Sequence, residues 1–532
     1  MVVREPRAWR AAKPRLTGLA RAARPRLARL ARAARPAPAG AARSAALRIA
    51  RLAAAAGTRP AGRPRTWQFT AGAATAGVAL AAAVVTAAGP WDSSGQRTAE
   101  RDRAAALQAA GGADHGVGSG TSADGPAPAP SAPPVLASLA RPQGGAPRLA
   151  GVLDPLLRDP ALGEQPAAVV VDLTDGHRLY GRNADAALTP ASTTKIATAT
   201  AALSALGPDH RFTTRTVLEP GTTRLVLVGG GDPTLTARAD ADGRASLRTL
   251  ADRTVAALTR RGLHDVTLAY DTSLFAGDGM HPIGVNDNLA RVTALAADEG
   301  RTDGSTSGPA PREPDPAAAA ARAFAGFLHA HGIRTGEPAR ATAASRAQTL
   351  ASVSSPPLSD VVERMLTESD NDIAETLARQ TALATGERPD FAGGARAITR
   401  RLAQLGLPLK GASFHDGSGL DRSDRLTASL LTALLRTAAD PARPGLRPIL
   451  TGLPVAAFTG TLTDRYTGQA AAGIVHAKTG TLTGVNTLAG TVVDRDGRLM
   501  AFAFLAEDTT DPQAAQSALD RAAAALAGCG CR

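Results

Sequence analysis

A serine and a lysine stand three residues apart in the segment PASTTKIATA, residues 190–199. A serine hydroxyl is a weak nucleophile that needs a nearby base. If a helix begins at Ser192, Lys195 lies one turn along the same face, beside that hydroxyl. The helix N-terminus and burial among small apolar side chains both favour an uncharged lysine. Alone the pair is a weak signal, because a serine here is equally typical of a helix cap.

Two further motifs carry polar groups that suit the same chemistry. ESDNDIAE contains Ser369 and Asn371, and HAKTGTL contains Lys478, Thr479 and Gly480. A second hydroxyl can relay a proton to a leaving group, and an amide can bind a peptide carbonyl. An edge strand bearing Lys-Thr-Gly can pair with an extended peptide and hold its carboxylate, while the glycine lets the ligand approach without a clash. The three motifs together predict a nucleophilic serine site that binds the carboxyl end of a peptide.

The order Ser-x-x-Lys, Ser-x-Asn, Lys-Thr-Gly is the active-site set of penicillin-recognising serine enzymes. Over about residues 149–528 the chain resembles the D-alanyl-D-alanine carboxypeptidase/endopeptidase family, the class C low-molecular-mass penicillin-binding proteins. Further motifs carry this resemblance and separate it from class A β-lactamases: GGGDPTL (229–235), YDTSLFAG (270–277), ALAADEG (294–300), DGSGLDR (416–422), FTGTL (458–462) and AKTGTLTGV (477–485).

The resemblance implies a role for each catalytic candidate. Ser192 would be acylated and Lys195 would be its base. The remaining members of the proton and charge network would be Ser369, Asn371 and Lys478. Water would then hydrolyse the acyl-enzyme, and no metal or cofactor would take part.

The resemblance also implies how substrate is held. Thr479 would bind the substrate carboxylate beside Gly480, and the backbone N–H groups of Ser192 and Thr481 would form an oxyanion hole. Such donors contribute ~3–4 kcal/mol of transition-state stabilisation. The partners would be peptidoglycan stem peptides ending in D-Ala-D-Ala, or D-centred cross-links, with β-lactams as suicide substrates.

The hydrophobic pattern predicts an α+β fold in which an antiparallel sheet is flanked by helices. A buried strand at 167–173 opens a hairpin, and three successive strands come near the C-terminus, followed by a helix at 514–528. Between them the pattern predicts strands within 223–235 and 265–271, and helices from Ser192, at 247–262, at 315–332 and on both sides of Ser369–Asn371.

Ser192 and Ser369 are separated by more chain than a compact β-lactamase-like core requires. We therefore expect a smaller inserted α/β domain at about 212–352. The stretch after Gly300 passes through a short loop rich in Gly, Ser, Thr and Pro straight into the helix at 315. A further domain, which the family often nests in this insert, is expected to be missing or much reduced.

The positive charge is concentrated at the N-terminus. The formal net charge of the 532-residue chain is +13, but residues 1–65 hold 17 Lys or Arg and one acidic residue. The remainder is near neutral, which argues against a nucleic-acid-binding face. The near-repeat at 15–25 and 26–36 could form amphipathic helices on anionic lipid. The alternative is a disordered cytoplasmic tail, which we favour.

Residues 66–91 contain no charged residue and are long enough to span a bilayer. Trp67 and Trp91 stand at the two ends, as interfacial aromatic residues do. The preceding basic residues predict a single-pass anchor in the cell membrane, with the N-terminus in the cytoplasm and the catalytic domain outside. A cleaved signal peptide is the alternative, although its basic leader would be unusually long. Residues 92–148 have the composition of a disordered spacer.

The remaining candidates favour structural roles. Asp232 and Asp416 stand in tight turns that they would stabilise, and His415 is expected to be a turn residue. The cysteines at 529 and 531 are expected in a solvated tail, 529–532, since one intervening residue would strain a disulfide. Two alternative functions stay open: a β-lactamase-like hydrolase on the same fold, and a catalytically weak scaffold that binds the cell wall. No oligomeric state is predicted.

Overall fold

The computed structural model describes residues 148–530. The basic tail and the anchor expected at 66–91 lie outside the described residues, as does the spacer up to residue 147. Among residues 148–530, no helix has both the length and the apolar character needed to cross a bilayer.

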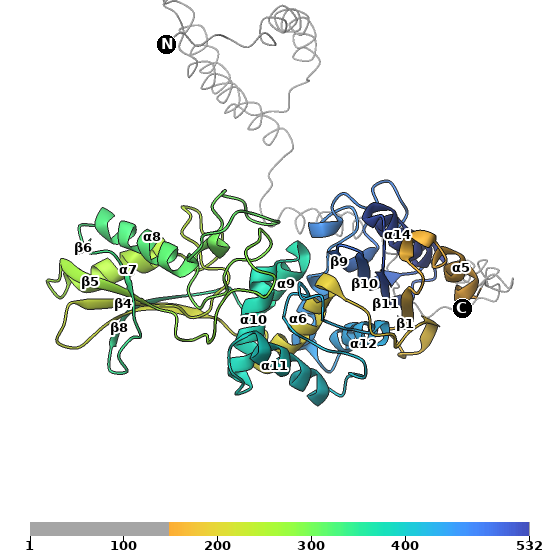
Figure 1. Ribbon diagram of the computed structural model, residues 1–532, viewed down its shortest axis with the longest axis horizontal. Coiled ribbons are helices and arrows are strands. Elements are labelled where there is room, and N and C mark those ends of the chain that lie inside the picture. The colour runs from red at the N-terminus through yellow and green to blue at the C-terminus, as the bar shows by residue number, and fades with distance from the viewer. Residues whose placement is uncertain (1–147, 531–532) are drawn as a thin grey trace, which may run out of the picture. The chain divides into compact units, whose positions relative to one another are not determined.

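Strands from the two ends of the described chain form a five-stranded antiparallel sheet (Figure 1). Its strands in spatial order are β2 (Arg178–Arg182), β1 (Ala167–Asp172), β11 (Leu499–Glu507), β10 (Val485–Val493) and β9 (Val475–Leu482). The predicted hairpin is β1–β2, and the three predicted C-terminal strands are β9, β10 and β11. The strand β9, which carries Lys-Thr-Gly, lies at the edge.

Helices cover both faces of this sheet, which explains why β1 is apolar at nearly every position. Side chains alternate across a strand, and those of Val169 and Val171 enter one hydrophobic core while Ala168 and Val170 enter the other. The core around Val170 is closed by α5 (Leu149–Leu156) and α14 (Pro512–Gly528). The opposite core is closed by α6 (Thr194–Leu206), α12 (Ala428–Ala439) and the helices packed on them.

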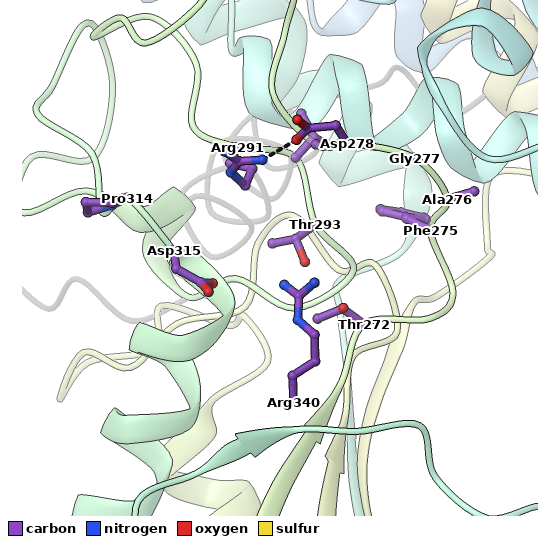
Figure 2. A pocket seen from close by; sticks show the side chains of 12 residues that line it. Thr272, Phe275, Ala276, Gly277, Asp278, Arg291, Thr293, Pro314, Asp315 and Arg340 are labelled. Atoms are coloured by element: carbon purple, nitrogen blue, oxygen red, sulfur yellow. Dashed lines mark hydrogen bonds and ion pairs between the residues drawn. The ribbon is translucent and has the colours of Figure 1, made fainter.

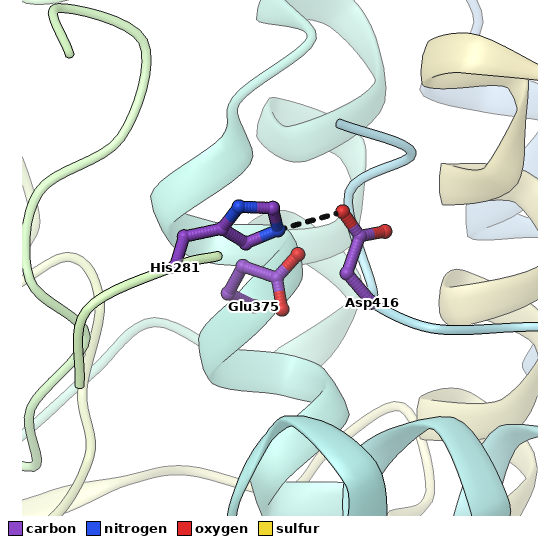
Figure 3. Close-up of side chains that lie close together, drawn as sticks. All are labelled: His281, Glu375 and Asp416. Carbon is purple, nitrogen blue, oxygen red and sulfur yellow. Dashed lines mark hydrogen bonds and ion pairs between the residues drawn. The ribbon is translucent and has the colours of Figure 1, made fainter. Parts of the chain in front are cut away.

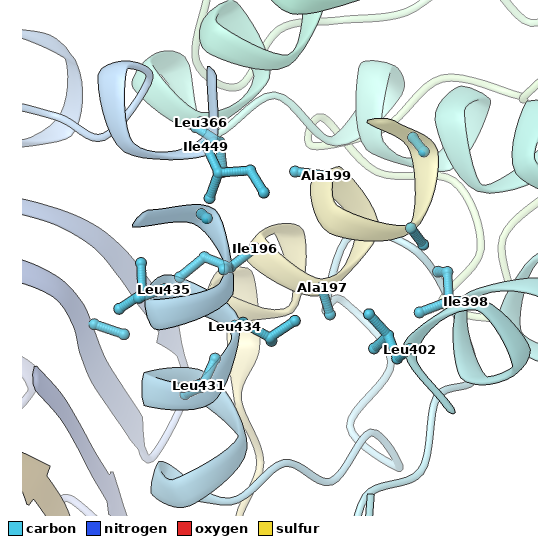
Figure 4. Packing of buried hydrophobic residues seen from close by; sticks show 14 of the residues in the cluster. Ile196, Ala197, Ala199, Leu366, Ile398, Leu402, Leu431, Leu434, Leu435 and Ile449 are labelled. Atoms are coloured by element: carbon cyan, nitrogen blue, oxygen red, sulfur yellow. The ribbon is translucent and has the colours of Figure 1, made fainter. Parts of the chain in front are cut away.

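The helix α6 is the centre of the larger core. All residues from Thr194 to Leu203 are buried, and Figure 4 shows Ile196 against α12 and Ala197 facing Leu402 of α11 (Phe391–Gln404). Small side chains on α6 let its neighbours approach closely. The other helices here are α9 (Leu358–Glu368), α10 (Asn371–Ala384), α11 (Phe391–Gln404) and α13 (Pro448–Thr451).

A second sheet is formed between α6 and α9, in the part of the chain where an insert is expected. It comprises β3 (Thr213–Leu218), β4 (Arg224–Val228), β5 (Asp265–Asp271), β6 (Arg334–Thr335), β7 (Ala339–Arg340) and β8 (Gln348–Ser354). The order is β6-β5-β4-β3-β8, with β7 beside β5; β4 and β5 are parallel, and α7 (Leu247–Thr259) connects them. The apolar faces of α7 and α8 (Pro316–Ala330) pack on this sheet.

The chain between β5 and α8 forms loops with one short 3₁₀ turn, η4 (Asp298–Gly300). No further sheet is present among these described residues. The other 3₁₀ turns are η2 (Pro160–Leu162), η3 (Ala191–Thr193), η5 (Pro444–Leu446) and η6 (Gly460–Leu462). At the C-terminus, Cys529 is buried in the same core as the apolar residues of α14. The expectation of a solvated tail from residue 529 is therefore wrong at its first residue.

Candidate active site

Ser192 lies in the 3₁₀ turn η3, and the helix α6 begins two residues later at Thr194. The expectation that the α-helix begins at Ser192 is wrong, but the tighter turn still brings Lys195 Nζ to 2.9 Å from Ser192 Oγ. Ala191 enters the turn with a φ of 47°, a conformation that costs a non-glycine residue about 1 kcal/mol. Close packing against Gly419 and Gly480 holds it there.

Lys195 is fully buried and saturated with acceptors. Its ammonium group donates to Ser192 Oγ at 2.9 Å, Asn371 Oδ1 at 2.6 Å and the Ser418 carbonyl at 2.8 Å. Burial lowers the pKa of Lys195 to about 8, although nearby carboxylates, Asp416 first among them, oppose this shift. A lysine with this pKa can lose its proton near neutral pH and act as a base.

The Ser369–Asn371 segment is the junction of two helices. α9 ends at Glu368, and Ser369 follows it as the C-cap with left-handed φ and ψ of 59° and 37°. The side chain of Asp370 caps α10. Asn371 is the first residue of α10, and its Nδ2 donates to the carbonyl of Asn288 at 2.9 Å. Because an amide nitrogen has two N–H groups, this bond uses only one of them.

Lys478 lies on β9 and is the second fully buried lysine. Its Nζ donates to Ser369 Oγ and to the carbonyl of Thr479, both at 2.8 Å. Burial holds the pKa of Lys478 well below its ordinary value, and the positive charges of Lys195 and Arg465 lower it further. Ser369 is thereby placed beside an amine that can exchange protons with it.

Thr479 and Gly480 follow Lys478 on the same edge strand. Thr479 Oγ1 lies 2.9 Å from Thr461 Oγ1 in the turn η6. A Cβ on Gly480 would lie 2.1 Å from Thr487 Oγ1 and 2.7 Å from the carbonyl oxygen of Pro190. The reason expected for this glycine, access for the ligand, is therefore wrong: its Cβ position is filled by the turn that carries Ser192.

The outer edge of β9 is open in the part of the strand that carries the motif. The start of the strand is paired with residues 454–456, but beyond Ala477 no described strand covers it. Thr481 is exposed there. An extended peptide can therefore add to this edge by β-augmentation.

The loop at 416–421 supplies the third acceptor of Lys195, the carbonyl of Ser418. Asp416 accepts the backbone N–H groups of Ser418, Gly419 and Asp421, which confirms that it stabilises a tight turn. Glu375 accepts the N–H groups of residues 417 and 418. The loop thereby presents the Ser418 carbonyl to Lys195.

Three contributors to this site were missed in the sequence: the Ser418 carbonyl, Glu375 and His281. Glu375 lies one helical turn after Asn371, which was an available signal. His281 Nε2 lies 3.0 Å from Asp416 Oδ2 (Figure 3), and nothing in its loop sequence marks it. The predicted turn residues behave as expected: Asp232 accepts from the backbone and hydroxyl of Thr234, and the N–H of His415 donates to Asp424.

Two groups of buried ligand atoms could hold a cation by their chemistry. The first is His281, Glu375 and Asp416, whose oxygens already accept several N–H groups and have Arg379 beside them. The second comprises Glu299, Asp370 and Asp372, and it is surrounded by the arginines at 301, 312 and 364. Within the described residues, these cations and N–H donors offset part of the carboxylate charge in both groups.

A polar cavity of about 520 Å³ lies in the inserted part of the chain. Figure 2 shows Arg340 pointing toward Thr293, with the Arg291–Asp278 ion pair above them. The described residues that line it include none of the predicted site residues. The cavity is therefore separate from the site around Ser192.

The fold and the arrangement of Ser192, two buried lysines, Ser369 and Asn371 define a penicillin-recognising serine enzyme. The model of the D-Ala-D-Ala carboxypeptidase 3 (S13) family matches residues 149–307 and 301–526, and the chain belongs to this family. The predicted family is thereby confirmed, and the chain is a serine-type peptidase of the D-Ala-D-Ala carboxypeptidase class.

Individual relatives agree with this assignment. A carboxypeptidase of Mycobacterium tuberculosis is 36% identical over 427 residues, which cover 76% of this chain and 90% of the relative. A D-alanyl-D-alanine carboxypeptidase of Actinomadura sp. is 30% identical over 442 residues, 68% of this chain and 81% of the relative. The structure of penicillin binding protein 4 from Haemophilus influenzae matches with a TM-score of 0.58 at 22% identity, over 69% of this chain and 97% of that chain. This structural likeness confirms the predicted fold class.

Proposed function

We propose that the chain removes the terminal D-alanine of peptidoglycan stem peptides through an acyl-enzyme on Ser192. One observation carries this assignment of roles: Lys195 Nζ bonds both Ser192 Oγ and Asn371 Oδ1, in a site bordered by the open edge of β9. A nucleophile, a base that can be neutral near pH 8 and a peptide-binding edge therefore occur in one place.

In the proposed acylation, neutral Lys195 takes the proton of Ser192 Oγ. The oxygen bonds to the carbonyl carbon of the scissile peptide, and the N–H groups of Ser192 and Thr481 stabilise the oxyanion. The C–N bond then breaks, and the leaving D-alanine amine receives a proton through Ser369, which Lys478 supports. Water hydrolyses the ester and releases the shortened peptide and Ser192.

Substrate recognition in this proposal uses the edge strand. The peptide pairs with β9, and its carboxylate binds the hydroxyl of Thr479 next to Lys478. When Thr479 donates to the carboxylate, Thr461 can donate to Thr479 in turn, because a hydroxyl both donates and accepts. The free N–H of Asn371 binds a substrate carbonyl. β-Lactams would acylate Ser192 in the same way.

The proposal includes attachment to the cell membrane through residues 66–91. The uncharged length of this segment and its terminal tryptophans support an anchor, and the basic residues before it support a cytoplasmic N-terminus. Deleting residues 66–91 should move the protein from the membrane fraction to the soluble fraction. A catalytic domain that protease cannot reach in intact spheroplasts would contradict the orientation.

The function is tested by incubating the full chain with benzylpenicillin and following its intact mass, beside Ser192→Ala. A long-lived adduct on the wild type only, with release of D-alanine from a stem pentapeptide, is the expected result. Rapid loss of penicillin without an adduct would instead indicate a β-lactamase-like hydrolase. Neither adduct nor turnover would favour a scaffold. Hydrolysis of a D-centred cross-linked peptide in the same assay measures endopeptidase activity.

A further inference from the structure

A buried histidine from the inserted segment reaches the loop that faces the catalytic lysine. His281 has only 3% of its surface exposed, and its Nε2 lies 3.0 Å from Asp416 Oδ2. The ring also packs edge-on against Phe391 at 5.1 Å between centroids. Figure 3 shows His281, Glu375 and Asp416 converging from three separate segments of the chain.

The partners of His281 fix one backbone carbonyl. Asp416 binds three N–H groups of its own loop, and Glu375 binds two. These five bonds hold the loop so that the Ser418 carbonyl accepts from Lys195 Nζ at 2.8 Å. A chain of direct contacts therefore runs from His281 through Asp416 and the loop to the amine.

We propose that His281 is a positioning residue for Lys195, acting through the loop that Asp416 holds. It does not touch the nucleophile or the base. Its ring fixes the carboxylate of Asp416, and its charge, when present, compensates that carboxylate. The insert thereby contributes to the reactivity of a site whose Ser-x-x-Lys, Ser-x-Asn and Lys-Thr-Gly motifs lie outside it.

The charged groups around His281 support the proposed compensation of the Asp416 carboxylate by the histidine. The acidic groups that face it are Asp416 and Asp421 of the loop and Glu375 of α10, whose pKa burial raises to about 7. Asp424 lies against Asp416, and Arg379, one turn further along α10, lies 4.0 Å from Glu375. Burial lowers the pKa of His281, but the hydrogen bond to Asp416 and these carboxylates outweigh it and raise the pKa above its usual value. Asp416 is also the carboxylate that most strongly raises the pKa of Lys195.

Removing the histidine therefore has a defined consequence. Wherever His281 is protonated, its loss removes a positive charge beside Asp416, so the charge of Asp416 acts more strongly on Lys195 and keeps the lysine protonated to higher pH. Neutral Lys195 then forms only at higher pH. The acid limb of the plot of acylation rate against pH therefore moves to higher pH. Loss of the hydrogen bond additionally loosens the loop and slows acylation at every pH.

The inference rests on the proposed function, and one experiment tests it. The rate of acylation of the full chain by benzylpenicillin is measured between about pH 6 and 9 for His281→Gln, His281→Phe and His331→Gln. His331→Gln is the matched control, because His331 also lies in the insert and pairs with an aspartate, Asp252, but at the surface. Melting temperatures of all variants show whether each is folded.

We expect His281→Gln, which keeps a donor without the charge, to move the acid limb upward by about half a pH unit. His281→Phe should show the same shift and a plateau about tenfold lower, while His331→Gln behaves as wild type. If His281→Phe does not fold, the acid limb of His281→Gln alone tests the inference. The inference would be overturned if His281→Gln were acylated at the wild-type rate with its acid limb at the wild-type pH, or if its rate fell while the acid limb stayed at that pH. Either result would leave the proposed peptidase function intact. A wild type that is not acylated would overturn both.

Discussion

Lys195 Nζ lies 2.6 Å from Asn371 Oδ1, and this bond joins residues 176 positions apart in the chain. An ammonium group can only donate, so the oxygen of the amide must face Lys195. The Nδ2 group is then turned toward the carbonyl of Asn288. One hydrogen bond thus orients the amide and gives the base a neutral, polar partner.

Replacing Asn371 by Asp tests the neutrality of this partner. A carboxylate beside Lys195 should raise the pKa of the lysine by about 1–3 units, so that less neutral base is present near pH 7. We expect acylation by benzylpenicillin at pH 7 to fall at least about tenfold, with partial recovery as the pH rises. Stopped-flow measurement of the acylation rate provides the test.

The control is Asn183→Asp, which makes the same chemical change where the amide binds the Pro166 carbonyl, away from the site. It should acylate at the wild-type rate. If Asn371→Asp retained wild-type rates at pH 7, Lys195 would not be the base.

The wild-type enzyme should itself show a titration near pH 8. Burial lowers the pKa of Lys195 to about 8, and only the neutral amine can accept the proton of Ser192. Below this pKa the neutral fraction falls tenfold for each pH unit, so the rate of acylation should rise with pH and level off above about pH 8. The melting temperature over the same range shows whether the protein remains folded. A rate that does not change between about pH 6 and 9 would contradict the assignment of the base.

Much of this site could be predicted because its side chains belong to short motifs with a characteristic order. Ser192 and Lys195 come together through local geometry alone, since three residues make one turn. The main sheet was predictable for a similar reason: β1 is a continuous apolar run, and β9, β10 and β11 are adjacent in sequence.

The features that the sequence did not predict were missed for physical reasons. The Ser418 carbonyl is a backbone atom, so no residue type marks it, and His281 acts through tertiary contact with a loop 135 residues away. Strand β3 was missed because its buried face is formed partly by Thr214 and Thr216 rather than by larger apolar residues. The role of Gly480 was misjudged because the turn packed against it comes from a distant part of the chain.

Lys478 leads to a prediction about the number of protons that the enzyme takes up when substrate binds. Burial and neighbouring cations hold the pKa of Lys478 well below its usual value, so the free enzyme favours the neutral amine more than an exposed lysine would. A substrate carboxylate beside it favours the charged form and raises its pKa. Binding of a D-Ala-D-Ala peptide to Ser192→Ala should therefore take up to about one proton, measured by titration calorimetry in buffers of different ionisation enthalpy.

A peptide with an amidated C-terminus provides the matched control, because it lacks the anion and should bind more weakly without proton uptake. Lys478→Gln in the same Ser192→Ala background should also abolish the uptake. Equal proton uptake by the acid and amide peptides would show that the proton goes to another group.

Gly480 offers the sharpest test of how the nucleophile is held in place. In Gly480→Ala the new Cβ would meet Thr487 Oγ1 at 2.1 Å and the Pro190 carbonyl at 2.7 Å, and Thr487 itself donates to that carbonyl at 2.8 Å. β9 and the turn before Ser192 must separate, at a cost of about 1–3 kcal/mol in the free energy of unfolding. Because Ser192 moves with the turn, acylation should fall about a hundredfold, far more than the stability loss would cause in a protein that remains folded. Gly181→Ala, on β2 of the same sheet, is the control, since the nearest neighbour of its Cβ would be the flexible Arg178 side chain at 3.3 Å, with Ala184 Cβ at an ordinary contact distance of 3.9 Å. Melting temperature and acylation rate are compared for both variants. If Gly480→Ala is acylated as fast as Gly181→Ala, contact with β9 is not what holds the nucleophile in position.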